Sequence, residues 1–107
     1  MDLRITLRDL GGVRVVALDG MVDLSSVPML QSQLRREIAT RAGTTIVVDV
    51  DGAISIDDVA LGVLLGAAAT AREAGGDLEV LTTSDRWRER FRTTRFEHAV
   101  TVRDRIV

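Results

Sequence analysis

The chain has 107 residues, a formal net charge of −2, and 46% hydrophobic residues. It has no Cys, and His98 is its only histidine, which excludes disulfides, thiolate chemistry, a Ser/His/Asp triad and a histidine-rich metal cluster. Without an excess of basic side chains, nucleic acid is not an expected partner. We therefore expect a single domain over residues 1–107 that is not an enzyme and needs no metal or other cofactor.

The chain shows no targeting segment and no membrane span. Residues 1–5 carry charges where a signal peptide needs an apolar core. The longest apolar run, residues 59–71, is interrupted by Thr70 and is too short to cross a bilayer. We expect a cytoplasmic protein without membrane contact.

The first 18 residues predict a β-hairpin. Residues 3–8 alternate between apolar and polar side chains, which is typical of a half-buried strand. The Gly11-Gly12 pair marks a turn before a second strand over residues 13–18, and residues 9–10 are expected to lengthen the loop.

A helix follows Ser25 and Ser26, either of which can cap its N-terminus. Pro28 falls in the first turn, where its missing N–H costs little. Gly43 is expected to end the helix. Its apolar stripe consists of Val27, Leu30, Leu34 and Ile38.

Residues 44–50 are β-branched and almost continuously apolar, which predicts a strand covered on both faces. A short piece over residues 53–56 leads to a second helix, capped by Asp57 and running to about Ala74. Gly62 and Gly66 lie on this helix, and a pair with that spacing indicates close packing against the sheet more often than dimerisation. The expected inward stripe is Leu61, Leu64, Leu65 and Ala68.

The last third predicts two more strands and one more helix. Residues 78–81 form a strand, Ser84 caps a helix on which Trp87 and Phe91 share a face, and residues 99–102 form a short final strand. The order β-β-α-β-α-β-α-β predicts an α/β fold. Its single layer of mostly parallel sheet has an antiparallel edge hairpin, and the helices pack on that layer.

Three segments in this order resemble the STAS domain family, named for sulfate transporters and anti-sigma-factor antagonists. The first is LDGMVD, residues 18–23, which is similar to the family's Leu-x-Gly-x-hydrophobic-Asp. The second is IVVDVDGAISIDDVALGVLLG, residues 46–66, similar to the buried strand, Asp-Ser-Ser-Gly signature and following helix. The third is AREAGGDL, residues 71–78, similar to the exit of that helix. The resemblance covers nearly the whole chain.

The resemblance implies a cytoplasmic, bacterial regulator of transcription that works by partner switching. In such antagonists of anti-sigma factors, the Ser directly after the signature Asp accepts a phosphate, and the anti-sigma factor is itself the serine kinase. The implied partner is therefore a serine-kinase-type anti-sigma factor. Asp57 matches the signature Asp, Asp58 stands at the phosphoacceptor position, and Val59 and Ala60 replace the second hydroxyl residue and the Gly.

The carboxylate of Asp58 cannot become a stable phosphoester, and it places permanent charge at a helix N-terminus. Since phosphoserine carries about −1.5 to −2 at neutral pH, Asp58 is a partial electrostatic copy of it. Two interpretations remain open. Asp58 holds the domain permanently in a state like the phosphorylated one, or the position is a retired site, meaning that it no longer acts as a phosphorylation site. The expected partner-binding rim comprises Met21, Asp23, Asp57, Asp58, Val59 and Ala60.

Other functions remain as alternatives. A small-ligand or nucleotide sensor using the same rim is disfavoured because Asp57 and Asp58 repel phosphates and no Gly-rich loop precedes the helix. A cation site including Asp49 and Asp51 matches no compact loop. A non-catalytic scaffold subunit is the third alternative. Residues 103–107 offer only about one turn of a final helix, so one face of the sheet is expected to be thinly covered. Self-association as a homodimer is therefore a further alternative.

Overall fold

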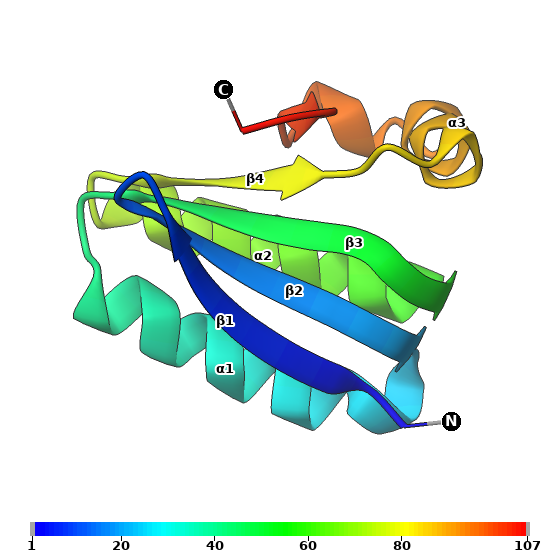
Figure 1. Ribbon diagram of the computed structural model, residues 1–107, viewed down its shortest axis with the longest axis horizontal. Helices are drawn as coiled ribbons and strands as arrows, with labels where there is room; N and C mark the ends of the chain where they lie inside the picture. Colours follow the sequence, from blue (N-terminus) through cyan, green and yellow to red (C-terminus); the bar gives the residue numbers. More distant parts are fainter. Residues whose placement is uncertain (1, 107) are drawn as a thin grey trace.

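The computed structural model describes residues 2–106 and confirms the predicted α/β class and element order (Figure 1). A five-stranded sheet has its strands in chain order, with β1 antiparallel to β2 and the remaining pairs parallel. The strands are β1 (Arg4–Leu10), β2 (Val13–Val22), β3 (Thr45–Ile56), β4 (Asp77–Leu81) and β5 (Val102–Arg103). The helices are α1 (Val27–Thr40), α2 (Asp58–Glu73) and α3 (Asp85–Thr93), with short 3₁₀ turns η1 (Leu24–Ser26) and η2 (Phe96–His98).

The α1 and α2 helices lie side by side on one face of the sheet (Figure 1). Because consecutive parallel strands are neighbours and crossovers are right-handed, successive connecting helices fall on the same side. The sequence predicted that the strand over residues 44–50 is covered on both faces. Helices cover only one of them. On the other face, Val15 and Val47 are still buried. Polar side chains from neighbouring strands cover that face, such as Arg8, whose guanidinium lies 3.2 Å from the Asp49 carboxylate.

The edge hairpin has a two-residue loop, so residues 9–10 do not lengthen it as expected. The β1–β2 ladder runs to the pair Leu10 and Val13. Gly11 and Gly12 both have positive φ, 58° and 83°, which is the backbone geometry that favours two-residue hairpins. Glycine adopts it without a steric penalty.

Both central parallel strands run past residues 18 and 50, where the sequence predicted their ends, and each continues through a glycine. Gly20 has a φ of 105°, and Gly52 lies so close to the Asp19 carboxylate that a side chain at residue 52 would collide with it. These glycines accommodate irregularities in the β2–β3 ladder, which continues to the pair Val22 and Ile56. The strands therefore end four and six residues later than predicted from the sequence, because each glycine lies within a strand.

The core lies between the helices and the sheet and is aliphatic except for the aromatic side chains of α3 and η2. On α2 the inward residues are Ala60, Leu61, Leu64, Ala68 and Ala71. Leu65 was expected among them but is 38% exposed, because one residue along a helix turns the side chain about 100° away from Leu64.

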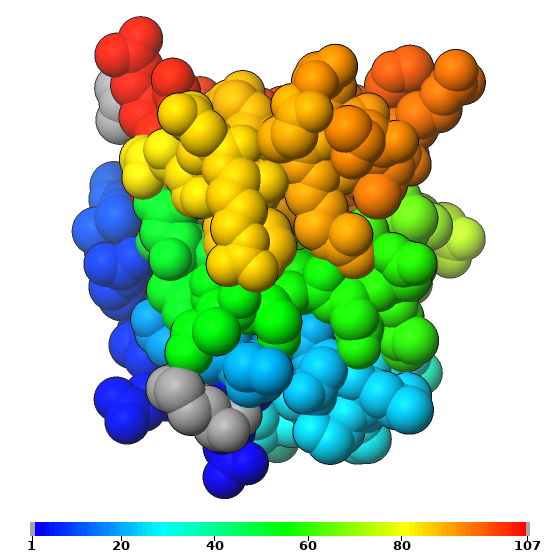
Figure 2. Space-filling model, turned by 90° about the vertical axis from the view of Figure 1, so that its right-hand side faces the viewer, coloured from blue at the N-terminus to red at the C-terminus, as the bar shows by residue number. Residues whose placement is uncertain are grey.

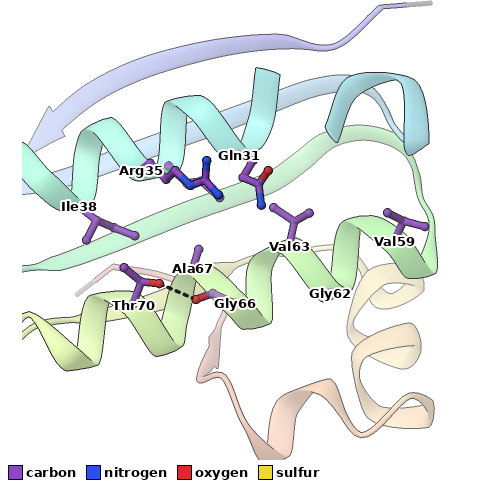
Figure 3. A pocket seen from close by; sticks show the side chains of 10 residues that line it. Gln31, Arg35, Ile38, Val59, Gly62, Val63, Gly66, Ala67 and Thr70 are labelled. Atoms are coloured by element: carbon purple, nitrogen blue, oxygen red, sulfur yellow. Dashed lines mark hydrogen bonds between the residues drawn. The ribbon is translucent and has the colours of Figure 1, made fainter. Parts of the chain in front are cut away.

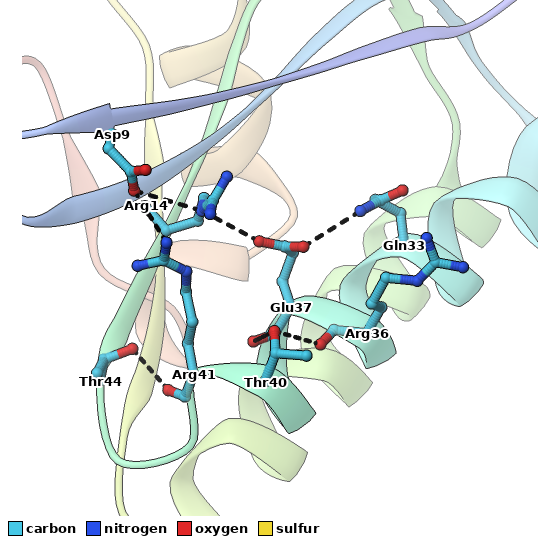
Figure 4. Close-up of polar contacts among 8 residues, drawn as sticks. All are labelled: Asp9, Arg14, Gln33, Arg36, Glu37, Thr40, Arg41 and Thr44. Carbon is cyan, nitrogen blue, oxygen red and sulfur yellow. Dashed lines mark hydrogen bonds and ion pairs between the residues drawn. The ribbon is translucent and has the colours of Figure 1, made fainter.

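A polar cluster joins the hairpin to α1 (Figure 4). Glu37 is buried on α1, and its carboxylate lies 3.2 Å from the Arg14 guanidinium of β2. Asp9 of β1 lies within 3.4 Å of Arg14 and 3.2 Å of Arg41. Since a buried carboxylate requires a partner, this cluster sets where α1 docks on the hairpin end of the sheet.

Arg95 is the one non-glycine residue with positive φ among the described residues, at 62°. Its left-handed conformation lets the chain turn from α3 into η2. Non-glycine residues in this conformation are strained.

Candidate functional site

The candidate site lies where β2 and β3 end. In open α/β sheets, ligands bind outside the carboxyl ends of parallel strands. Val22 pairs with Ile56 at the last rung, and the Asp57 N–H donates to the Val22 carbonyl at 3.1 Å. Asp23 and Asp57 therefore follow directly on neighbouring strands. Figure 2 views this edge, where η1, the start of α2 and α3 lie next to one another.

Asp57 holds the starts of two helical segments at once. Its Oδ1 accepts from the Ala60 N–H at 3.0 Å, which caps α2, as the sequence predicted. Its Oδ2 accepts from the Leu24 N–H at 3.1 Å, at the start of η1. The second bond joins residues 33 positions apart, and no sequence pattern indicated it. One carboxylate thus connects the segment before α1 to α2.

Asp23, rather than Ser25 or Ser26, caps the chain before α1. Its Oδ1 accepts from the Ser25 N–H at 3.1 Å and the Ser25 hydroxyl at 2.7 Å, while the Ser26 hydroxyl accepts from the Asp23 N–H at 2.9 Å. Ser26 makes no side-chain cap to α1. The hydrogen bond from the Ser25 hydroxyl is the largest cause that lowers the pKa of Asp23 below its ordinary value. Asp23 therefore stays ionised at neutral pH.

Asp58 is the first residue of α2, and its side chain is 89% exposed. Its Oδ1 lies 2.9 Å from Nη2 of Arg90, which projects from α3. The charge at this position therefore has a counter-ion within the same chain. Arg90 is 32 residues away in the sequence, so only the docking of α3 brings the pair together.

Large apolar side chains are exposed on the chain segments that carry these carboxylates and at the start of α1. Leu24 is 68% exposed on η1, Met29 and Ile54 are each 44% exposed, and Val59 is 46% exposed in the first turn of α2. The sequence had indicated only Val59 among these. Exposed apolar clusters with polar borders are typical of protein contacts.

Two other residues expected at the rim contribute less surface. Met21 is partly buried, and its sulfur lies 3.5 Å from the Ser55 hydroxyl. The Ala60 side chain is fully buried, so only its backbone N–H takes part, as a donor to Asp57. We use "rim" below for Met21, Asp23, Leu24, Met29, Ile54, Asp57, Asp58 and Val59.

The remaining acids of this region have separate partners. Asp49 pairs with Arg8, whereas Asp51 accepts from the Thr82 hydroxyl at 2.7 Å and from the Thr83 N–H and hydroxyl at 2.8 and 2.6 Å. Within residues 2–106, no three His, Cys, Asp or Glu side chains are grouped so as to hold a metal ion. Asp51 instead anchors the loop that leads from β4 into α3.

Asp51 provides a pH-dependent contribution to stability. Burial raises its pKa, but the hydrogen bonds from Thr83 and Thr82 outweigh this and leave the pKa below its ordinary value of 3.8. A carboxyl group whose pKa is lowered by folding stabilises the protein above the unfolded-state pKa and loses this contribution as pH falls through the folded-state pKa. We expect Asp51→Asn to lower the free energy of unfolding at pH 7 by about 1 kcal/mol. Urea unfolding between pH 7 and 3 checks this. The difference from the unmodified protein should shrink below about pH 4, and a constant difference would contradict it.

These features define an α/β domain with a candidate binding edge at the carboxyl ends of its central strands. A model of the STAS domain family matches residues 4–107. The chain belongs to the STAS domain family. Within residues 2–106, none of the helices has the length and apolar character needed to cross a lipid bilayer.

Solved structures share this fold at low sequence identity. An anti-sigma factor antagonist from Mycobacterium paratuberculosis aligns with a TM-score of 0.85 at 18% identity, over 98% of this chain and 88% of that one. A putative anti-sigma factor antagonist from Thermotoga maritima aligns with a TM-score of 0.82 at 15% identity, over 95% and 87%. Phosphorylated SpoIIAA, a Bacillus cell fate determinant, aligns with a TM-score of 0.68 at 20% identity, over 92% and 90%. No curated protein matches the sequence.

Proposed function

We propose that this domain is a cytoplasmic regulator of the anti-sigma-factor-antagonist type, and that it binds a serine-kinase-type anti-sigma factor through the rim. The observation that carries the proposal is the exposure of Leu24 and Val59 beside the carboxylates of Asp57 and Asp58. Apolar anchors bordered by charges are what a specific protein contact requires. Structural neighbours with the same fold are described as anti-sigma factor antagonists.

We further infer that Asp58 is a retired phosphorylation site rather than a permanent copy of phosphoserine. A carboxylate has one charge where phosphoserine has about −1.5 to −2, and the pairing with Arg90 offsets that one charge. An exposed ion pair is weak, so a partner can displace it. Binding would then depend on the apolar rim and would not be switched at this position.

Calorimetry against the kinase-type anti-sigma factors encoded in the same genome tests the proposal. The unmodified protein should bind one of them. Val59→Glu should weaken binding at least tenfold, because it places a charge in the apolar contact. Leu65→Glu is the matched control, since Leu65 is exposed on α2 but lies outside the rim. Absence of binding, or equal binding by both variants, would overturn the proposal.

Incubation of this anti-sigma factor with ATP tests the account of Asp58. The unmodified chain should gain no phosphate, whereas Asp58→Ser should gain one, as measured by mass spectrometry. Phosphate on the unmodified chain, at Ser55 or Ser26 for example, would contradict the account of Asp58 while leaving rim binding intact.

A further inference from the structure

A groove runs between α1 and α2 on the helical face, and it begins at the rim (Figure 3). Its volume is about 340 Å³, and Val59, which belongs to the rim, lines one end. Leu34 and Ile38 of α1 and Val63 of α2 give it an apolar lining. The groove is therefore continuous with the proposed partner surface.

Two glycines keep this groove open. Gly62 and Gly66 lie one turn apart on the groove side of α2, and a Cβ added to either would meet no atom within 4 Å. The interpretation that they pack closely against the sheet is therefore wrong. Glycine in the middle of a helix is destabilising relative to alanine, and here no contact within the chain requires it. The glycines weaken the helix and leave space that the folded chain does not use itself.

The groove carries positive charge without a counter-ion. Arg35 is the only charged residue that lines it. Among the described residues, the Arg35 side chain makes no ion pair or hydrogen bond, and neither does the side chain of Gln31, one turn earlier on α1. Figure 3 shows both side chains extending from α1 over the space between the helices. An occupant that complements this charge has an apolar surface and a carboxylate.

We propose that the groove receives an amphipathic helix of the anti-sigma factor, with its apolar side over Gly62 and Gly66 and an acidic side chain facing Arg35. The proposal rests on the proposed function and names the element of the partner that binds. Small residues one turn apart allow two helices to approach closely, and helices in apolar grooves are a recurring mode of recognition. From Val59 to Thr70 the groove spans about 16 Å of helix, enough for about three turns of a partner helix.

Filling the groove tests the proposal against the anti-sigma factor identified above. Gly66→Leu should weaken binding at least tenfold, because its side chain occupies the helix path. Ala69→Leu adds the same side chain to α2 at an exposed position outside the groove, and it should change binding less than twofold. Equal binding by Gly66→Leu and the unmodified protein would overturn the groove proposal and leave rim binding intact.

Charge reversal gives a second readout. Arg35→Glu should weaken binding at least tenfold, whereas Arg36→Glu, exposed on the same helix but outside the groove, should have little effect. Equal effects of the two variants would overturn the proposed pairing, since they would reflect net charge alone. If the unmodified protein binds no anti-sigma factor, the proposed function itself fails, and the helical occupant fails with it.

Thermal unfolding of the protein alone tests the premise that Gly62 and Gly66 are not required by the fold. Gly62→Ala and Gly66→Ala should each raise the Tm by several degrees, because alanine favours the helix and collides with nothing. A lower Tm for either variant would show that the glycines serve the fold and would overturn the inference. Self-association that Gly66→Leu abolishes, or an apolar carboxylate found bound by native mass spectrometry, would assign the groove to another occupant and also overturn it.

Discussion

Phe91→Ala is expected to lower the free energy of unfolding by about 3–5 kcal/mol. Phe91 is fully buried on α3, and its ring centroid lies 4.9 Å from that of Phe96. Only three aromatic residues occur in the chain, and with Trp87 all three lie in this part of the core. A domain of this size has a free energy of unfolding of about 5–15 kcal/mol. The substitution therefore removes a large part of the protein's stability. Urea unfolding at constant m-value measures it.

Phe91→Leu is the matched control, because it keeps most of the apolar volume and should cost less than about 1.5 kcal/mol. A loss of similar size for both variants would show that ring packing, not cavity formation, dominates. A loss below about 1.5 kcal/mol for Phe91→Ala would contradict the prediction, since it would mean that the core beside α3 closes over the deleted ring.

Gly20→Ala should lower the free energy of unfolding by about 3 kcal/mol, from a strained backbone and a collision together. Gly20 has a φ of 105°, and a Cβ at this position would overlap the backbone carbonyl of Asp2. Gly20 is also the glycine of the LDGMVD segment, so the structure gives that motif a steric reason. Thermal unfolding measures the change in stability.

Gly12→Ala separates the two causes. Gly12 also has positive φ, 83°, but a Cβ there would meet nothing within 4 Å. Only the backbone strain remains, so the expected loss is about 1–2 kcal/mol. If Gly20→Ala cost no more than Gly12→Ala, the close approach of the N-terminal segment would not contribute to stability.

Most of the fold could be predicted because it follows from periodic patterns along the chain. Alternation, helical stripes and caps such as Asp57 are local signals, and they gave the correct order of elements. The errors arose where tertiary contacts, rather than local sequence, determine where an element begins or ends. The second strand was predicted to end at Leu18, yet β2 continues through Gly20 to Val22. Ser25 or Ser26 was expected to cap the helix, but Asp23 caps η1 and Ser26 makes no side-chain cap to α1.

The candidate site could be predicted only as far as the strands themselves specify it. Asp23 and Asp57 follow neighbouring parallel strands, so topology alone brings them together. Arg90 could not be found in this way, because its distance from Asp58 depends on how α3 docks. Leu24 was missed because nothing local distinguishes an exposed leucine from a buried one.

The double attachment of Asp57 has a mechanical consequence. One short side chain holds the starts of α2 and η1, so the width of a single carboxylate sets the gap between the two helical segments at that end of the molecule. Asp57 therefore works as a short link between these two segments, and a longer acid such as glutamate would change their separation while keeping the charge.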